Sequence, residues 1–272
     1  MRWPGIFRRR PKPFAAAPAD DGLWEGLLAS GPVLRRLPPA EAAVRRGLCG
    51  EFLAAKDREG VRGRVLEPAM ALRVAAWACL PLLRLGIDWY DDWNNLFISP
   101  AGFTDTRQRW EAGGAVTEWE DDLAGEVLEL GPVVLSWDDV LEAGSGSGYN
   151  VVIHEMAHKL DARDGELDGA PPLPRGMREA WQTTFRGAWE EFSRQVDQWE
   201  RRGRLGAARG AARPGRGHVR LSLDDYAADS PEEFFAVCCE HFFDRPLGLK
   251  SAWPAVYDCL AGFFRLDPAS WI

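Results

Sequence analysis

The chain has 272 residues, of which 46% are hydrophobic and 27% are charged. This composition is ordinary for a soluble globular protein, and the length suits one sizeable domain, with or without a smaller appended piece. The formal net charge of −8 argues against nucleic acid as a partner, because phosphate binding requires a clustered basic surface.

The sequence carries no signature of secretion or membrane insertion. Residues 1–20 are rich in proline, arginine and alanine, and we expect a disordered tail without the apolar segment of a signal peptide. The most apolar stretch, residues 69–85, contains Arg73, Pro81 and Arg84, which suit a core helix better than a membrane span. The five cysteines are odd in number and irregularly spaced, as is typical of free thiols in a reducing compartment. We therefore expect a cytoplasmic protein that does not bind a membrane.

Helical periodicity dominates the N-terminal part of the chain. Apolar residues recur at helical spacing over residues 23–60, with two proline-containing breaks. Pro68 is placed to open a helix that runs to about Leu80. We expect this helical part to occupy about residues 21–90.

Strand patterns follow. Residues 93–99 and 133–137 are strand candidates, the second reading Val-Val-Leu-Ser-Trp. Residues 138–142 are expected to form a short helix or turn, and 144–148 a Gly-Ser loop. A helix with a buried apolar face then begins after Asn150.

Three more helices are predicted in the C-terminal part. The first covers residues 177–201 with a stripe of aromatic residues, and a solvated Gly/Ala/Arg-rich loop follows at 203–220. Ser-Pro-Glu-Glu at 230–233 marks the next helix start, with Ser as N-cap, Pro at the first position and Glu at the third. This helix continues through Phe243, and the last helix covers residues 255–264.

The chemistry is carried by His154-Glu155-Met156-Ala157-His158. Residues four apart lie on one face of a helix, so the two imidazoles can reach a single tetrahedral zinc. Glu155 follows the first histidine and can accept a proton from the water that attacks a carbonyl group. The alternative is that the two histidines share a helix face by chance and pair with acidic residues.

A third ligand is required, and two candidates remain open. Asp164 lies six residues after His158, but Asp161 occupies the position where peptidases with such a near ligand have a glycine. Glu233 lies on a separate downstream helix, which is the usual arrangement for a distant third ligand. Its alternative role is to close a capping box with Ser230.

Two further residues are candidates for supporting roles. Asp161 can accept the hydrogen bond from the second nitrogen of a ligating histidine, or can form a surface salt bridge with Lys159 or Arg163. The hydroxyl of Tyr226 can donate to a developing oxyanion, although packing is an equal alternative. We expect His241 to have a structural role and not to bind the metal.

Three segments resemble a known family, the Mlc titration factor A peptidases of bacteria. They are Val-Val-Ile-His-Glu-Met-Ala-His-Lys-Leu-Asp at 151–161, Asp-Tyr-Ala-Ala at 225–228 and Pro-Glu-Glu-Phe-Phe-Ala-Val at 231–237. The resemblance covers nearly the whole chain after the tail. The basic segment at 201–220 is longer than the family needs, which bears on the partner surface more than on the chemistry.

The resemblance implies a cytosolic zinc peptidase with aminopeptidase activity and a zincin-like core preceded by helices. Carried over by position, His154, His158 and Glu233 would hold one Zn²⁺. Glu155 would be the catalytic base and Tyr226 the transition-state donor. Family members also bind the repressor Mlc in the regulation of glucose transport, so the implied partners are a peptide substrate and a repressor of this kind.

We therefore expect an α+β, helix-rich, zincin-like fold with a small sheet beside the metal helix. A single domain would cover residues 21–272, with its catalytic part at about 91–272. The favoured function is peptide hydrolysis, since the intact Glu155 would have no role at a structural zinc. The alternative is a non-enzymatic regulatory protein that binds and sequesters a transcriptional repressor.

Overall fold

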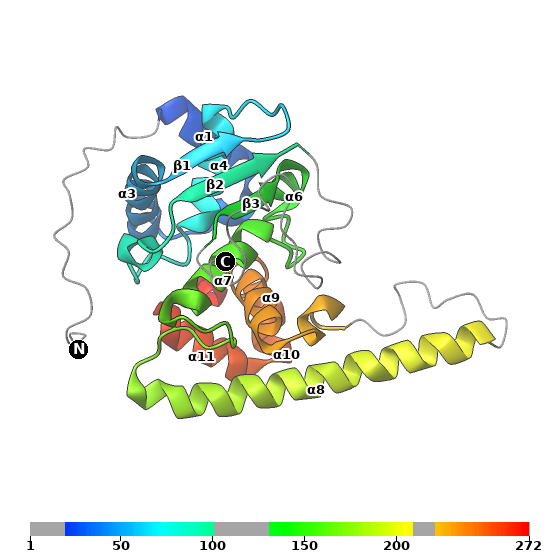
Figure 1. The fold of residues 1–272 in the computed structure, drawn as a ribbon. Coiled ribbons are helices and arrows are strands. Elements are labelled where there is room, and N and C mark those ends of the chain that lie inside the picture. The colour runs from blue at the N-terminus through cyan, green and yellow to red at the C-terminus, as the bar shows by residue number, and fades with distance from the viewer. Residues whose placement is uncertain (1–19, 101–130, 209–220, 272) are drawn as a thin grey trace.

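The computed structural model describes residues 20–100, 131–208 and 221–271. The predicted tail, apart from residue 20, and residues 209–220 of the predicted basic loop lie outside these ranges. The described elements form a helix-rich α+β structure in which a small sheet and the N-terminal helices lie on one side of helix α7 (Figure 1). The C-terminal helices lie on the other side of α7, so this helix occupies the middle of the described elements.

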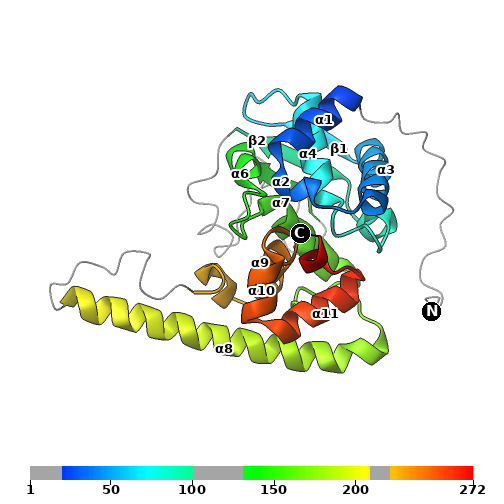
Figure 2. The same ribbon diagram turned by 180° about the vertical axis from the view of Figure 1, so that it is seen from behind.

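The N-terminal helices agree with the predicted helical part. They are α1 (Asp21–Ser30), α2 (Pro32–Arg35), α3 (Pro39–Ala55) and α4 (Pro68–Ala78). The carboxylate of Asp20 caps α1 by accepting from the backbone N–H of Gly22 at 2.8 Å, and proline begins each of the other three helices. Seen from behind, α1, α2 and α4 lie in front of the sheet (Figure 2).

The sheet has three parallel strands in the order β1-β2-β3. Strands β2 (Asn95–Ser99) and β3 (Val133–Ser136) confirm the two predicted strands in slightly shorter form, and Leu96 pairs with Val133. Strand β1 (Asp57–Gly60) was not predicted, because its four residues have no apolar alternation. Helix α4 lies on the crossover that parallel pairing of β1 and β2 requires.

The central helix pair is α7 (Val151–Asp161) and α9 (Pro231–Asp244). Helix α6 (Trp137–Glu142) follows β3 directly and leads through the Gly-Ser loop to α7. Helix α7 contacts α4 and β3 on one side and α9 on the other. Every side chain of α9 from Phe234 to Asp244 is buried, which identifies α9 as the core helix of the C-terminal part.

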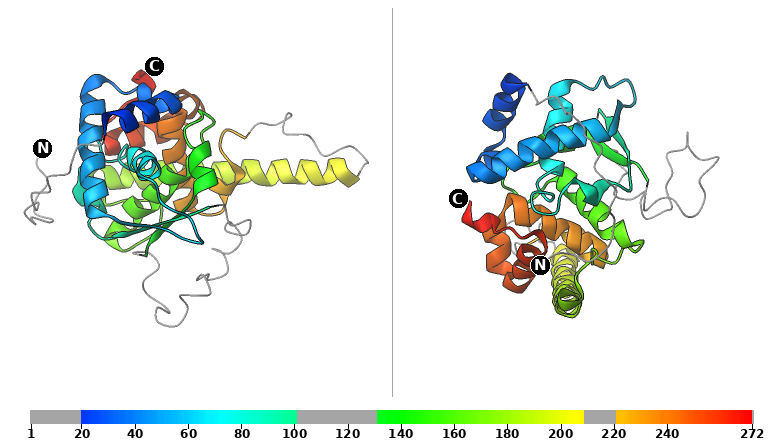
Figure 3. Two further views of the ribbon diagram at one scale, coloured as in Figure 1. Left: turned by 90° about the horizontal axis from the view of Figure 1, so that it is seen from above. Right: turned by 90° about the vertical axis from the view of Figure 1, so that its left-hand side faces the viewer.

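Helix α8 (Arg175–Ala208) is longer than predicted. The prediction of a loop from residue 203 is wrong for residues 203–208, which continue the helix; the alanine, leucine and arginine in this stretch are strong helix formers and offset its glycines. The C-terminal end of α8 projects well beyond the other described elements (Figure 3). Its N-terminal half packs beside α9 and α11.

Two short helices complete the chain. Helix α11 (Pro254–Phe264) confirms the predicted last helix, whereas α10 (Pro246–Ala252) was not predicted. The aromatic side chains of α8, α9 and α11 form one contact network, in which Trp181 stacks on Phe185 at 4.2 Å between ring centroids and meets Phe235 edge-on at 5.8 Å. In the part of the chain that the structure describes, every helix is too short or too polar to span a bilayer.

Candidate metal centre

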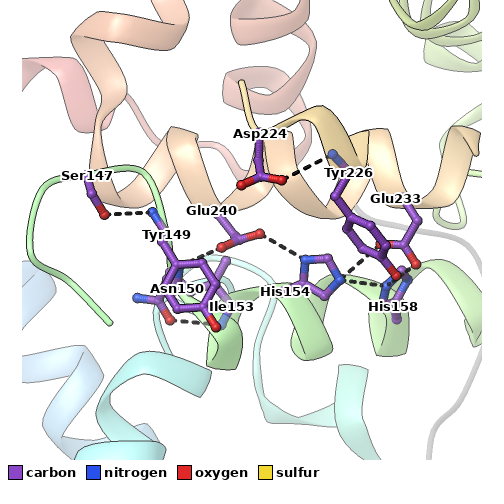
Figure 4. A network of polar contacts seen from close by, with 10 residues as sticks. All are labelled: Ser147, Tyr149, Asn150, Ile153, His154, His158, Asp224, Tyr226, Glu233 and Glu240. Atoms are coloured by element: carbon purple, nitrogen blue, oxygen red, sulfur yellow. Dashed lines mark hydrogen bonds and ion pairs between the residues drawn. The ribbon is translucent and has the colours of Figure 1, made fainter. Parts of the chain in front are cut away.

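Helix α7 presents two histidines one turn apart. Its N-terminus is capped by Asn150, whose side-chain oxygen accepts from the backbone N–H of Ile153 at 3.1 Å. The apolar face of α7 is buried, and His154 and His158 point from the opposite face toward α9 (Figure 4). Their side chains are 14% and 20% exposed, so the pair is sheltered but reachable from solvent.

Glu233 reaches this pair from the first turn of α9. Ser230 is the N-cap, and its hydroxyl oxygen accepts from the backbone N–H of Glu233 at 3.4 Å. The Glu233 carboxylate lies 3.1 Å from His154 Nε2 and 3.5 Å from His158 Nε2. The helix cap therefore uses the backbone of Glu233, while its side chain faces the histidines.

The three side chains offer a coherent donor set for a metal. Ligand atoms of His154, His158 and Glu233 all lie within 4.8 Å of one another. The two Nε2 atoms are 3.1 Å apart, close to the separation of about 3.3 Å that a tetrahedral zinc imposes on two nitrogen ligands. Glu233 Oε2 is buried, and its contact is the same His154 Nε2 that a metal would bind, at 3.1 Å. Asp164, the other ligand candidate, is exposed and does not belong to this group.

The charges at the site favour a cation. Burial lowers the pKa of His154, but Glu233 and Glu240 raise it through hydrogen bonds and charge, and the net pKa is well above the usual value. Burial raises the pKa of Glu233, but the hydrogen bonds and charges of His154 and His158 lower it by a larger amount. The net pKa is therefore well below its usual range. Both shifts show that positive charge among these donor atoms is stabilised.

The carboxylate that contacts Nδ1 of His154, the nitrogen that faces away from the donor set, belongs to Glu240 and not to Asp161. Glu240 Oε1 lies 2.8 Å from His154 Nδ1. Asp161 is buried at the end of α7, where its Oδ2 accepts from the backbone N–H of Gly169 at 2.8 Å. Asp161 therefore binds the backbone of the loop after α7, and the hydrogen bond expected from a histidine goes to Glu240.

Glu155 and Tyr226 flank the donor set. Tyr226 lies on the 3₁₀ helix η4 (Asp225–Ala228), and its ring centroid is 6.0 Å from that of His154. Its phenol points toward Glu233 and His158 (Figure 4). Burial raises the pKa of Tyr226, and the charges of Glu233 and Glu155 raise it further, so the hydroxyl remains a proton donor at neutral pH. Half-buried Glu155 is thus close enough to affect Tyr226 electrostatically.

Residues 6–265 match the model of one protein family, described as Glucose-regulated metallo-peptidase M90. The chain belongs to this family. It is 33% identical to the Mlc titration factor A of Klebsiella pneumoniae (strain 342) over 256 residues, which are 90% of this chain and 86% of the relative. It is 31% identical to that of Salmonella agona (strain SL483), over 92% and 88% of the two chains, and 32% identical to that of Escherichia fergusonii, over 90% and 86%. The predicted family resemblance is confirmed.

Membership in this metallopeptidase family implies a bound metal, and the histidine and glutamate side chains described above fit that requirement. Sequence reasoning did not assign two residues of the site. Glu240 carried one usable signal, a spacing of seven residues from Glu233 that places both on one helix face. The second is Trp189 of α8, whose indole Nε1 donates to the carbonyl oxygen of Ala228 in η4 at 3.2 Å. No local sequence pattern links Trp189 to Ala228, which are 39 positions apart.

Proposed function

We propose that this metallopeptidase-family protein is a zinc-dependent peptidase of the aminopeptidase type. The observation that carries the proposal is the convergence of His154 Nε2, His158 Nε2 and the Glu233 carboxylate beside Glu155. Two imidazoles and one carboxylate are the protein ligands of a frequent class of catalytic zinc sites. The aminopeptidase type rests on the family resemblance of the sequence.

Each side chain of the site has a defined role in this proposal. His154, His158 and Glu233 would hold one Zn²⁺, which when bound supplies Lewis-acid polarisation of the scissile carbonyl and of the attacking water. Glu155 accepts a proton from that water and delivers it to the leaving amine. The hydroxyl of Tyr226 donates a hydrogen bond to the oxyanion that develops on the carbonyl oxygen.

The five free cysteines support a cytoplasmic location. All five lie in the described ranges, and four of them are buried. Unpaired thiols of this kind suit a reducing compartment, where disulfides are rare. We accordingly expect the peptidase to act on cytoplasmic peptides.

A second candidate function is binding of a transcriptional repressor. The relatives are named Mlc titration factor A, a name that refers to Mlc. We propose that this chain can bind Mlc or a similar regulator and so affect sugar uptake. Repressor binding and peptide hydrolysis are compatible, because neither function excludes the other.

The decisive experiment combines metal analysis with a panel of aminoacyl anilides and N-acetylated peptides. We expect one zinc per chain and hydrolysis of substrates with a free amino terminus. Glu155→Gln should abolish hydrolysis while zinc remains bound, because the change removes only the base. Glu166→Gln, at an exposed glutamate outside the site, is the matched control and should leave the rate unchanged.

Three results would count against the proposal. Hydrolysis that survives Glu155→Gln would reject the role of Glu155, and protein without stoichiometric zinc would reject the metal site. Cleavage of acetylated peptides at internal bonds alone would reject the aminopeptidase type. A pull-down with purified Mlc, using wild type and Glu155→Gln, tests the second candidate function, and equal binding by both proteins would separate it from hydrolysis.

A further inference from the structure

A buried carboxylate on α9 joins the start of the metal helix to its first histidine. Glu240 is 4% exposed and lies two turns after Glu233 on the same helix. Its Oε2 accepts from the backbone N–H of Asn150 at 2.5 Å, and its Oε1 lies 2.8 Å from Nδ1 of His154 (Figure 4). One side chain therefore holds both the N-cap of α7 and an imidazole of the donor set.

These two contacts determine which nitrogen of His154 carries the proton. The backbone N–H of Asn150 can only donate, so Oε2 is committed as an acceptor. Imidazole is a stronger base than a carboxylate, so the proton between Oε1 and Nδ1 belongs to the ring. With Nδ1 protonated, the neutral ring has its lone pair on Nε2, the atom that faces His158 and Glu233.

We propose that Glu240 is the positioning residue that fixes His154 in the Nδ1–H tautomer and so prepares its Nε2 for the metal. This inference rests on the proposed metal site. It assigns Glu240 no contact with substrate and no proton transfer. The effect of Glu240 on the metal passes through His154.

The second histidine of the pair has no comparable support. His158 Nδ1 is buried and has no hydrogen-bond partner among the described residues. The tautomer of His158 is therefore not set by a protein carboxylate in the described part of the chain. Among the two histidines, His154 alone has a carboxylate that sets its tautomer in the described part of the chain. Removing Glu240 should therefore change the affinity of the site for the metal measurably.

A glutamine cannot replace Glu240 at this position. Both contacts require an acceptor oxygen, and an amide has only one. If the amide oxygen keeps the Asn150 N–H, its NH₂ group faces His154 Nδ1 and favours the tautomer with the proton on Nε2. If the amide oxygen faces His154 instead, the NH₂ group meets the Asn150 N–H, and α7 loses its tie to α9.

The chain offers a matched control one turn further along α9. Asp244 is also buried, and its two carboxylate oxygens accept from the backbone N–H groups of Gly146 at 3.3 Å and Gly148 at 2.7 Å. Asp244→Asn removes one acceptor from a buried two-contact carboxylate, as Glu240→Gln does, but its contacts are with the Gly-Ser loop. Asp244→Asn should therefore destabilise the fold about as much as Glu240→Gln does, but it should not affect His154.

The test is a zinc competition titration of full-length wild type, Glu240→Gln and Asp244→Asn against a chromophoric chelator. We expect the zinc dissociation constant of Glu240→Gln to rise roughly 10- to 100-fold, as for other residues that support a ligating histidine. The value for Asp244→Asn should equal that of wild type. Equal affinities for Glu240→Gln and wild type, or equal losses in both variants, would overturn the inference.

A second measurement does not depend on the folding of any variant. In wild type labelled with ¹⁵N-histidine and loaded with ¹¹³Cd²⁺, the metal should couple to Nε2 of His154, and Nδ1 should carry a slowly exchanging proton. Coupling to Nδ1, or the absence of that proton, would overturn the inference. Wild type that binds neither metal would instead reject the proposed function, so the two failures are distinguishable.

Discussion

The indole nitrogen of Trp189 donates a hydrogen bond to the carbonyl oxygen of Ala228, two residues after Tyr226. The hydroxyl of Ser193, one turn further along α8, approaches the same carbonyl at 3.4 Å. Helix α8 thus holds the turn that carries the proposed oxyanion donor, although it contributes no residue to the donor set. The position of Tyr226 depends on a helix that projects away from the site.

Trp189→Phe tests this dependence. The change keeps an aromatic ring but removes the hydrogen bond to Ala228, which contributes about 1 kcal/mol to holding η4 in place. If the same energy is lost from the transition state, kcat falls roughly fivefold. Zinc content should not change. Trp199→Phe, on the same helix, is the control and should keep full activity; equal losses in both variants would show that the effect comes from α8 as a whole.

Tyr226→Phe removes the proposed donor itself. Loss of a single oxyanion donor lowers kcat by about 10²- to 10³-fold, and we expect a change of this size with KM and bound zinc nearly unchanged. Steady-state kinetics on an aminoacyl anilide, together with metal analysis, measures both quantities. Tyr149→Phe is the control, because Tyr149 lies at the other end of the polar network (Figure 4). Unchanged kcat in Tyr226→Phe would assign this tyrosine to packing.

Asp161→Asn should stabilise the protein at neutral and alkaline pH. Burial raises the pKa of Asp161 from 3.8 to about 7, and the hydrogen bond from Gly169 opposes this only in part. The folded state therefore keeps a proton that the unfolded chain loses, so the contribution of Asp161 to stability is complete below pH 3.8 and is lost as the pH rises toward 7. Asparagine cannot ionise, so it avoids the cost of a buried negative charge. We expect its free energy of unfolding to exceed that of wild type by about 1 kcal/mol or more at pH 8.

Urea denaturation of wild type and Asp161→Asn at pH 4.5 and pH 8 measures this gain, which should be larger at the higher pH. A variant less stable than wild type at both values would contradict the argument. Zinc affinity is the companion measurement. It should be unchanged, because Asp161 contacts Gly169 and not a histidine.

His241 should contribute to acid unfolding. Burial, together with the charge of Arg245, lowers its pKa from 6.5 to about 4. The folded state holds the ring neutral while the unfolded chain takes up a proton, so its contribution to stability is complete above pH 6.5 and is lost as the pH falls toward 4. His241→Gln should reduce the fall in stability across this window by on the order of 3 kcal/mol. Identical pH profiles for variant and wild type would show that His241 is not responsible.

The metal helix could be predicted from sequence because its signals are local. His154 and His158 are four residues apart, and Asn150 and Ser230 mark the starts of their helices with side chains that cap them. The choice of Glu233 as third ligand needed the family resemblance, since Asp164 and a capping box were both open alternatives. The structure shows why both Ser230 and Glu233 matter: the cap uses one backbone group and leaves the carboxylate for the site.

The features that sequence reasoning missed depend on contacts between distant segments. Strand β1 has no apolar pattern of its own and forms by pairing with β2. The sequence makes Asp161 a candidate partner for a ligating histidine or for Lys159 or Arg163, all near it in sequence, yet its carboxylate accepts from the backbone of Gly169. Glu240 is 86 residues from His154, and only the packing of α9 on α7 brings the two together.

Gly169→Ala should weaken the metal site from outside it. Gly169 has a φ of +77°, and a Cβ atom there would lie 2.5 Å from the backbone oxygen of Pro231, the first residue of α9. The collision would push the start of α9, and with it Glu233, away from α7. We expect a destabilisation of about 1–3 kcal/mol from the strained backbone, with an increase in the zinc dissociation constant in addition.

Gly165→Ala separates these two effects. Gly165 has a similar φ of +92°, but a Cβ atom there would meet nothing within 4 Å. This variant should therefore suffer the backbone strain of about 1–2 kcal/mol and keep its zinc affinity. Thermal unfolding and chelator competition on both variants provide the comparison. If both bind zinc as wild type does, the start of α9 tolerates the added methyl group, and the contact between Gly169 and Pro231 does not set the position of Glu233.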